Sequence, residues 1–150
     1  MLREDLQKVL KESMLAHDAL TTSAVRMIIA GMKEKDVDAR GKGKEKATDD
    51  ELMSMMQTMI KQRNDSIKMY IDGNRPELAE KEKAEIAVIE RFLPKQMNDA
   101  EIEAAIKALV AETGATSMKD MGKVMGALKA KYAGQMDFGK ANGVVKACLS

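Results

Sequence analysis

The spacing of apolar residues constrains the fold of this chain more than any other feature. Apolar residues recur every three or four positions, as in Leu2, Leu6, Val9 and Leu10, through almost the whole sequence. This period places them on one face of an α-helix and differs from the alternation of a β-strand. Only two of the 150 residues are prolines, so few positions would interrupt a helix. The pattern predicts an all-α protein.

Capping residues and glycines divide this pattern into seven predicted helices. Thr48 with Glu51, and Asn98 with Glu101, have the spacing of a capping box, which begins a helix. Six of the predicted helices span residues 2–15, 48–72, 76–91, 99–112, 118–132 and 138–149. The remaining one, second in the chain, is capped by Thr21 and Thr22 and fades near Arg40. Ser117 and Asp137 are the predicted caps of the last two helices.

A proline marks the predicted boundary between two parts of the chain. Pro94 disfavours helix at Leu93, and a new helix starts after Asn98. We therefore expect an N-terminal four-helix bundle over residues 1–92, followed by a small three-helix C-terminal lobe over residues 93–150. Within the bundle, residues 41–46 combine glycines with charges, which predicts a flexible, solvated connection. No strand precedes this segment, so it is not a phosphate-binding loop of the P-loop type.

Two charged positions interrupt the apolar stripes of the predicted helices 48–72 and 76–91. Arg63 lies between Ile60 and Ile67, and the short link between the helices predicts an antiparallel hairpin that brings Arg63 level with Glu85, one turn from Glu82. We interpret the three residues as a structural ion pair. The alternative is an acid–base pair in a cleft, but no nucleophile or histidine is positioned to act with it.

The sequence predicts neither catalysis nor a bound metal or cofactor. The single His17 has no cysteine or second histidine at ligand spacing, and the single Cys148 lies on an apolar helix face, as a small core residue would. No secretory signal and no membrane-spanning apolar run are recognisable, from which we expect a cytoplasmic protein without a membrane partner. Nothing in the sequence specifies the oligomeric state.

The last third of the chain combines lysines with glycines that lie off the apolar stripes. Residues 117–150 contain six lysines against two acidic residues, a net charge of +4. A glycine inside a helix costs about 1 kcal/mol relative to alanine, so four of them outside the core indicate close approach by another molecule. The candidate contact residues are Lys119, Gly122, Lys123, Gly126, Lys129, Gly139, Lys140, Gly143 and Lys146.

Several short motifs, in this order along the chain, resemble a known family. They are Leu2-Arg3, Arg26, Ile60-Lys61-Gln62-Arg63-Asn64-Asp65-Ser66, Phe92-Leu93-Pro94-Lys95-Gln96, Asp120-Met121-Gly122-Lys123-Val124-Met125, Gly134-Gln135-Met136-Asp137 and Val144-Val145-Lys146. On these motifs the chain resembles the stand-alone YqeY-like proteins of the GatB/YqeY family. Their region also forms the C-terminal tail of the B subunit of the tRNA-dependent amidotransferase.

The resemblance implies an all-helical, two-part fold, contact with tRNA, and a tRNA-aminoacylation or amidotransferase protein as a further partner. It implies no catalysis, because the catalytic part of the B subunit has no counterpart here. Three hypotheses follow: an RNA-binding accessory module, a protein-interaction module without RNA, and an enzyme. The third has no nucleophile and base to support it. Since aromatic residues are only 3% of the chain, an RNA contact would read backbone and shape instead of stacked bases.

Overall fold

The computed structural model describes the whole chain from Met1 to Ser150, with seven α-helices, one short 3₁₀ turn and no strand. The predicted all-α class is confirmed. Contacts group the residues into two compact units, Met1–Pro94 (unit 1) and Lys95–Ser150 (unit 2). None of the helices combines the length and the apolar character that crossing a bilayer requires.

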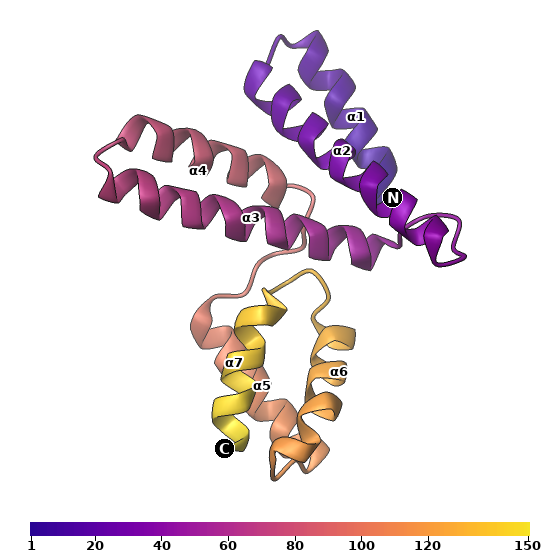
Figure 1. Ribbon diagram of the computed structural model, residues 1–150, viewed down its shortest axis with the longest axis vertical. Helices are drawn as coiled ribbons and strands as arrows, with labels where there is room; N and C mark the ends of the chain where they lie inside the picture. The colour runs from indigo at the N-terminus through magenta and orange to yellow at the C-terminus, as the bar shows by residue number, and fades with distance from the viewer. The chain divides into compact units, whose positions relative to one another are not determined.

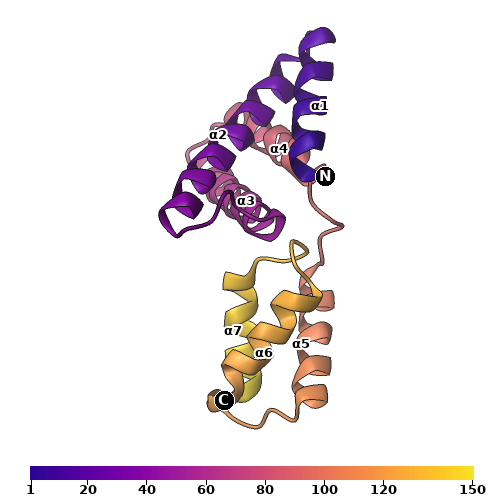
Figure 2. The same cartoon turned by 90° about the vertical axis from the view of Figure 1, so that its right-hand side faces the viewer.

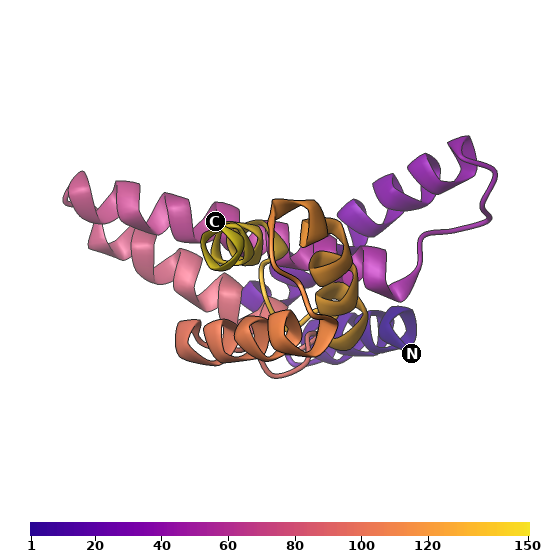
Figure 3. The ribbon, with the colours of Figure 1, turned by 90° about the horizontal axis from the view of Figure 1, so that it is seen from below.

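Unit 1 consists of two helical hairpins. Helix α1 (Leu2–Leu15) pairs with α2 (Ala19–Gly41), and α3 (Asp49–Asp72) pairs with α4 (Pro76–Glu90). Figure 1 and Figure 3 show the second hairpin crossing the first, with α3 and α4 side by side. Helix α2 joins the hairpins, since it contacts α1, α3 and α4. Unit 1 thus contains the four helices expected for residues 1–92, arranged as two crossed pairs.

The core of unit 1 forms where the two hairpins cross. Its largest fully buried side chains come from all four helices, and they are Leu6, Val25, Ile28, Leu52, Met56 and Ile89. Beyond Met56, α3 has no buried residue, because α3 and α4 continue past α2 as a two-helix hairpin. The crossing therefore concentrates the apolar contacts of unit 1 at one end of α3.

The loop between α2 and α3 begins with a hydrogen-bonded turn, and residues 41–46, predicted to form a solvated connection, are all exposed. The N–H groups of Lys42, Gly43 and Lys44 donate to the last carbonyls of α2 at 2.9–3.0 Å. Gly43 has a φ of +79°, a left-handed conformation that glycine adopts without strain. Further along, the carboxylate of Asp36 accepts from the N–H of Ala47 at 2.9 Å and from Arg3 at 2.6 and 2.8 Å.

The start of α2 differs from the prediction. The helix begins at Ala19, and the side chain of Asp18 accepts from the N–H of Thr21 at 3.1 Å. The hydroxyl of Thr21 itself donates to Asp18 at 2.7 Å, so Thr21 is inside the helix and does not cap it. A carboxylate accepts a capping hydrogen bond more strongly than a hydroxyl, which explains the earlier start.

Unit 2 is a three-helix lobe of α5 (Asp99–Thr113), α6 (Met121–Lys131) and α7 (Phe138–Leu149). Figure 2 shows α5 and α7 running in the same direction and α6 running against them. Each helix packs against the other two around a core that includes Ile106, Val124, Leu128, Ala141 and Val145. The backbone of Met97 donates to Gln135 at 2.9 Å, which ties the entry of unit 2 to the α6–α7 connection.

The helix predicted for residues 118–132 is shorter and starts differently. Residues Met118–Asp120 form a 3₁₀ turn, and α6 begins at Met121. Ser117 makes no capping hydrogen bond; instead the carboxylate of Asp120 accepts from the N–H of Thr116 at 3.0 Å. Asp120, the last residue of the turn, thus satisfies a donor that precedes Ser117, and not one of the first N–H groups of the helix that a serine cap would satisfy.

Candidate functional site

The two glycines of α6 lie on a bare helix surface. Gly122 and Gly126 are exposed, and a Cβ atom at either position would meet no atom within 4 Å. No packing contact within the fold therefore requires glycine there, although each costs helix stability. Backbone is presented directly to solvent over one turn of α6.

Lysines surround these two glycines. Lys119, Lys123 and Lys129 are exposed on the same helix or its 3₁₀ turn. The ammonium of Lys123 donates to the carbonyl of Thr113 at 3.2 Å, at the end of α5. Lys119 and Lys129 take part in none of the ion pairs of the protein. We call Lys119, Gly122, Lys123, Gly126 and Lys129 the α6 face.

The candidate residues of α7 have different surroundings. Gly139 follows the helix cap, and a Cβ there would lie 3.2 Å from the carboxylate of Asp137, which accepts the Gly139 N–H at 2.9 Å. The ammonium of Lys140 forms a short ion pair with Asp99 of α5. Lys146 is exposed and unpaired. The cap at Asp137 accounts for glycine at position 139, and the ammonium of Lys140 is already paired with the carboxylate of Asp99.

Gly143 lines a groove between α5 and α7. The groove encloses about 450 Å³, and its walls are Asp99, Ile102, Glu103, Lys140, Gly143, Val144 and Ala147. Its floor is apolar and its rim carries the Asp99–Lys140 pair. The lining carries two carboxylates, Asp99 and Glu103, against the single lysine Lys140, and this negative balance disfavours a phosphate and distinguishes the groove from the α6 face.

The three residues interpreted as an ion pair meet between α3 and α4. The guanidinium Nε of Arg63 donates to Glu85 at 3.1 Å and lies 3.9 Å from Glu82. Its Nη1 donates to the carbonyl of Met59 at 3.1 Å, and its Nη2 lies 3.5 Å from the sulfur of Met27 on α2. The side chains of Arg63 and Glu85 are each 12% exposed. The pair therefore joins α3 to α4, and through Met27 it reaches α2.

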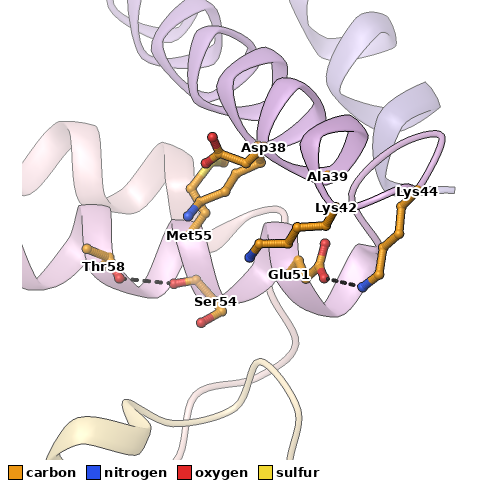
Figure 4. Close-up of a pocket in the computed structure, with 9 residues that line it drawn as sticks. Asp38, Ala39, Lys42, Lys44, Glu51, Ser54, Met55 and Thr58 are labelled. Atoms are coloured by element: carbon orange, nitrogen blue, oxygen red, sulfur yellow. Dashed lines mark hydrogen bonds and ion pairs between the residues drawn. The ribbon is translucent and has the colours of Figure 1, made fainter.

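A second concave surface lies between the end of α2 and the first half of α3. The cavity encloses about 270 Å³ and is lined by Lys35, Asp38, Ala39, Lys42, Lys44, Glu51, Ser54, Met55 and Thr58. Figure 4 shows Lys42 and Lys44 extending from the end of α2 toward α3, with the ammonium of Lys44 on Glu51 at 3.2 Å. Sequence reasoning missed this cavity, although the alternating lysines and glycines of 41–46 were a signal for it. We call it the α2–α3 pocket.

No group of three or more histidine, cysteine, aspartate or glutamate side chains is arranged to hold a metal ion. His17 has a φ of +55° in the exposed turn between α1 and α2. Cys148 is half-buried and packs against the core of unit 2.

The chain is similar to fungal proteins that carry the name altered inheritance of mitochondria protein 41, mitochondrial. The relative from Lachancea thermotolerans is 36% identical over 72% of this chain and 57% of its own length. The relative from Candida glabrata is 43% identical over 59% of this chain and 47% of its own length. A third, from Vanderwaltozyma polyspora, is 33% identical over 77% of this chain and 64% of its own length. The chain thus spans between about half and two thirds of these relatives.

The names of these relatives contradict the cytoplasmic location predicted from the sequence, because each is named as a mitochondrial protein. The prediction was wrong because it rested on a missing secretory signal and a missing membrane span. Neither absence distinguishes the cytoplasm from the interior of an organelle. The same names mention no catalytic activity.

The comparison with protein families covers almost the whole chain. The profile of the family described as Yqey-like protein matches residues 3–149, through both units and all seven helices. This extent includes every motif on which the resemblance was based except the first residue of Leu2-Arg3. The chain therefore belongs to the Yqey-like protein family.

Proposed function

We propose that the protein is a non-catalytic accessory module that binds the backbone of structured RNA, with tRNA as the ligand, through the α6 face. The observation that carries the proposal is the open space above Gly122 and Gly126 among exposed lysines. A ribose–phosphate chain can approach a helix closely only where no Cβ intervenes, and lysines beside it can meet the phosphates.

The electrostatics of α6 support this ligand. Residues 117–150 have a net charge of +4, and the two unpaired lysines of the α6 face have no internal carboxylate to displace. The proposal is confined to α6, because Lys140 is engaged by Asp99 and Gly143 borders two carboxylates. Tyr132 is the one aromatic residue near the end of α6, so the contact would follow backbone shape and little base sequence.

The test measures tRNA binding against salt concentration for matched variants of the full chain. Lys129→Ala should weaken binding and reduce the slope of log K against log salt by about 0.7–0.9, as expected for one lost phosphate contact. Lys68→Ala removes an exposed lysine from α3 and should leave the slope unchanged. Lys123 is less suitable, because its removal also deletes the hydrogen bond to Thr113.

A pair of substitutions at one glycine separates this contact from general electrostatic attraction. Gly126→Leu should block the backbone approach, whereas Gly126→Ala adds one methyl group; both should raise helix stability. A large loss of tRNA affinity for leucine and a small one for alanine is expected. Equal affinity of both variants and the unmodified chain would contradict the proposal, as would the absence of tRNA binding at low salt.

The groove between α5 and α7 favours a second candidate function, a protein-interaction module. Its apolar floor and the open backbone at Gly143 suit an apolar helix of a partner protein. Crosslinking in cells distinguishes the two candidates. Recovery of tRNA that depends on Gly126 supports the first, and recovery of one protein, without RNA and lost in Gly143→Leu, supports the second.

A further inference from the structure

We infer that the α2–α3 pocket of unit 1 is a phosphate-binding site. The pocket is independent of the α6 face, since it lies in the other unit and shares no residue with it. Three of its nine lining residues are lysines, from α2 and from the turn that follows it.

Two of these lysines have no anionic partner within the protein. Lys44 forms an ion pair with Glu51, whose carboxylate also accepts the N–H of Thr48 at 3.1 Å. Lys35 and Lys42 take part in no ion pair, although Asp38 lines the same pocket. Asp38 is unpaired as well, so the three lysines against the two carboxylates Asp38 and Glu51 leave the lining with a net charge of +1, which favours an anion.

The backbone turn at Gly43 fixes the positions from which the side chains of Lys42 and Lys44 extend. Gly43 takes the left-handed conformation that ends α2, and the N–H of Lys44 donates to the carbonyl of Ala39 at 2.9 Å. The turn directs both of its flanking lysines, Lys42 and Lys44, to the pocket (Figure 4). A bound anion would therefore meet lysines that already lie at its site, which lowers the entropic cost of binding.

The rest of the pocket suits a phosphate ester better than a bare ion. Ala39 and Met55 contribute apolar surface to the lining, whereas the hydroxyl of Thr58 donates to the carbonyl of Ser54 within α3 at 3.2 Å. The volume of about 270 Å³ exceeds what one phosphate fills, so a carbon group attached to the phosphate has space beside Met55. The phosphate could come from a free phosphorylated small molecule or from a nucleic-acid backbone.

The first experiment titrates the isotope-labelled full chain with inorganic phosphate at constant ionic strength and follows the backbone amides by NMR. Saturable shifts should be confined to residues lining the pocket. The double variant Lys35→Gln/Lys42→Gln should weaken binding by about tenfold or more, the effect of losing charge-assisted hydrogen bonds. The matched control Lys33→Gln/Lys46→Gln removes two exposed lysines outside the pocket and should bind as the unmodified chain does.

Two results would overturn the inference. One is a titration without saturation, and the other is an equal loss of affinity in both double variants, which would indicate general electrostatic attraction. A parallel titration with tRNA distinguishes the sources of the phosphate. If only the pocket variant loses tRNA affinity, the phosphate belongs to a nucleic acid. If both double variants bind tRNA alike and only the pocket variant loses affinity for inorganic phosphate, the phosphate belongs to a small molecule. The phosphate titration does not involve Lys129 or Gly126, and the tRNA comparison is made between two variants that both retain them, so this inference and the α6 proposal can fail separately.

Discussion

Asp36 holds three segments of unit 1 in contact through one carboxylate. It accepts two hydrogen bonds from Arg3 of α1 and one from the backbone of Ala47, which is 2% exposed. The same guanidinium donates to the carbonyl of Ala47 at 2.8 Å. The hydrogen bonds from Arg3 are the main reason that the pKa of Asp36 is lowered to about 2. An acid of this kind stabilises the fold only while it is charged.

The substitution Asp36→Asn tests this network. Because the folded-state pKa is lowered, the stabilisation is present above the unfolded pKa near 4 and is lost as the pH falls toward 2. The variant should be less stable than the unmodified chain by about 2 kcal/mol at pH 7, and the difference should shrink between pH 4 and pH 2. Urea unfolding followed by circular dichroism at several pH values measures it. Asp38→Asn, at an exposed and unpaired position, serves as the control; a difference independent of pH would refute the explanation.

The ion pair of Arg63 leads to a second stability prediction, because the side chains of Arg63 and Glu85 are both nearly buried. Arg63→Ala leaves Glu85 without a cation and should cost about 2–4 kcal/mol. The double variant Arg63→Met/Glu85→Leu replaces the pair by apolar groups and should recover more than half of that loss. Unfolding free energies of Arg63→Met, Glu85→Leu and the double variant form the required cycle, and Arg63→Ala is measured beside them. A cost below about 0.5 kcal/mol for Arg63→Ala would place the pair among weak surface contacts.

Sequence spacing predicts the pairing of Arg63 with Glu85 but does not predict the pairing of Asp36 with Arg3. Arg63 interrupts an apolar stripe within a hairpin whose register follows from a short link. Arg3 and Asp36 are 33 residues apart on helices whose relative rotation no local pattern specifies. The same reason explains α7: its sequence shows that Lys140 lies off the apolar stripe, but only the packing of α5 reveals that Asp99 neutralises it.

The sequence predicts some helix ends correctly and others incorrectly. The capping boxes of α3 and α5 were predictable, since both partners lie within four residues, and the structure contains them. The start of α2 was misassigned because Asp18, Thr21 and Thr22 are all capping types, and a choice among them depends on the preceding turn. The crossing of the two hairpins was not predictable either, because helical periodicity identifies the apolar face of a helix and not its partner.

Two caps of the same predicted type should respond differently to alanine. Asn98→Ala removes the acceptor that holds the N–H of Glu101 at 2.8 Å and should destabilise unit 2 by about 1 kcal/mol. Ser117→Ala removes a side chain that makes no capping hydrogen bond and should change stability by less than about 0.5 kcal/mol. Thermal unfolding of both variants decides it; similar losses would mean that Ser117 caps a helix in solution.

At the scale of the whole molecule, the chain changes units within very few residues. Phe92 and Leu93 pack with the core of unit 1, whereas Met97 is hydrogen-bonded within unit 2. Each unit has its own apolar core, with no residue common to both. Units built in this way can unfold as separate cooperative groups.

Core substitutions should therefore act on one unit at a time. Leu6→Ala and Leu128→Ala each remove a fully buried side chain, one from each unit, and each should cost about 2–5 kcal/mol. Hydrogen exchange should show the first raising exchange only in residues 1–94 and the second only in residues 95–150. If either substitution raises exchange equally in both ranges, the chain is one cooperative unit.

The division after Pro94 also distributes the intrinsic fluorophores of the protein. The chain has no tryptophan and two tyrosines, Tyr70 on α3 and Tyr132 at the end of α6, so each unit contains one emitter. Both side chains are half-buried and exchange packing contacts for water on unfolding. Replacing one tyrosine by phenylalanine leaves the emission of the other as an optical report on a single unit, so that binding to unit 1 and binding to unit 2 can be followed separately.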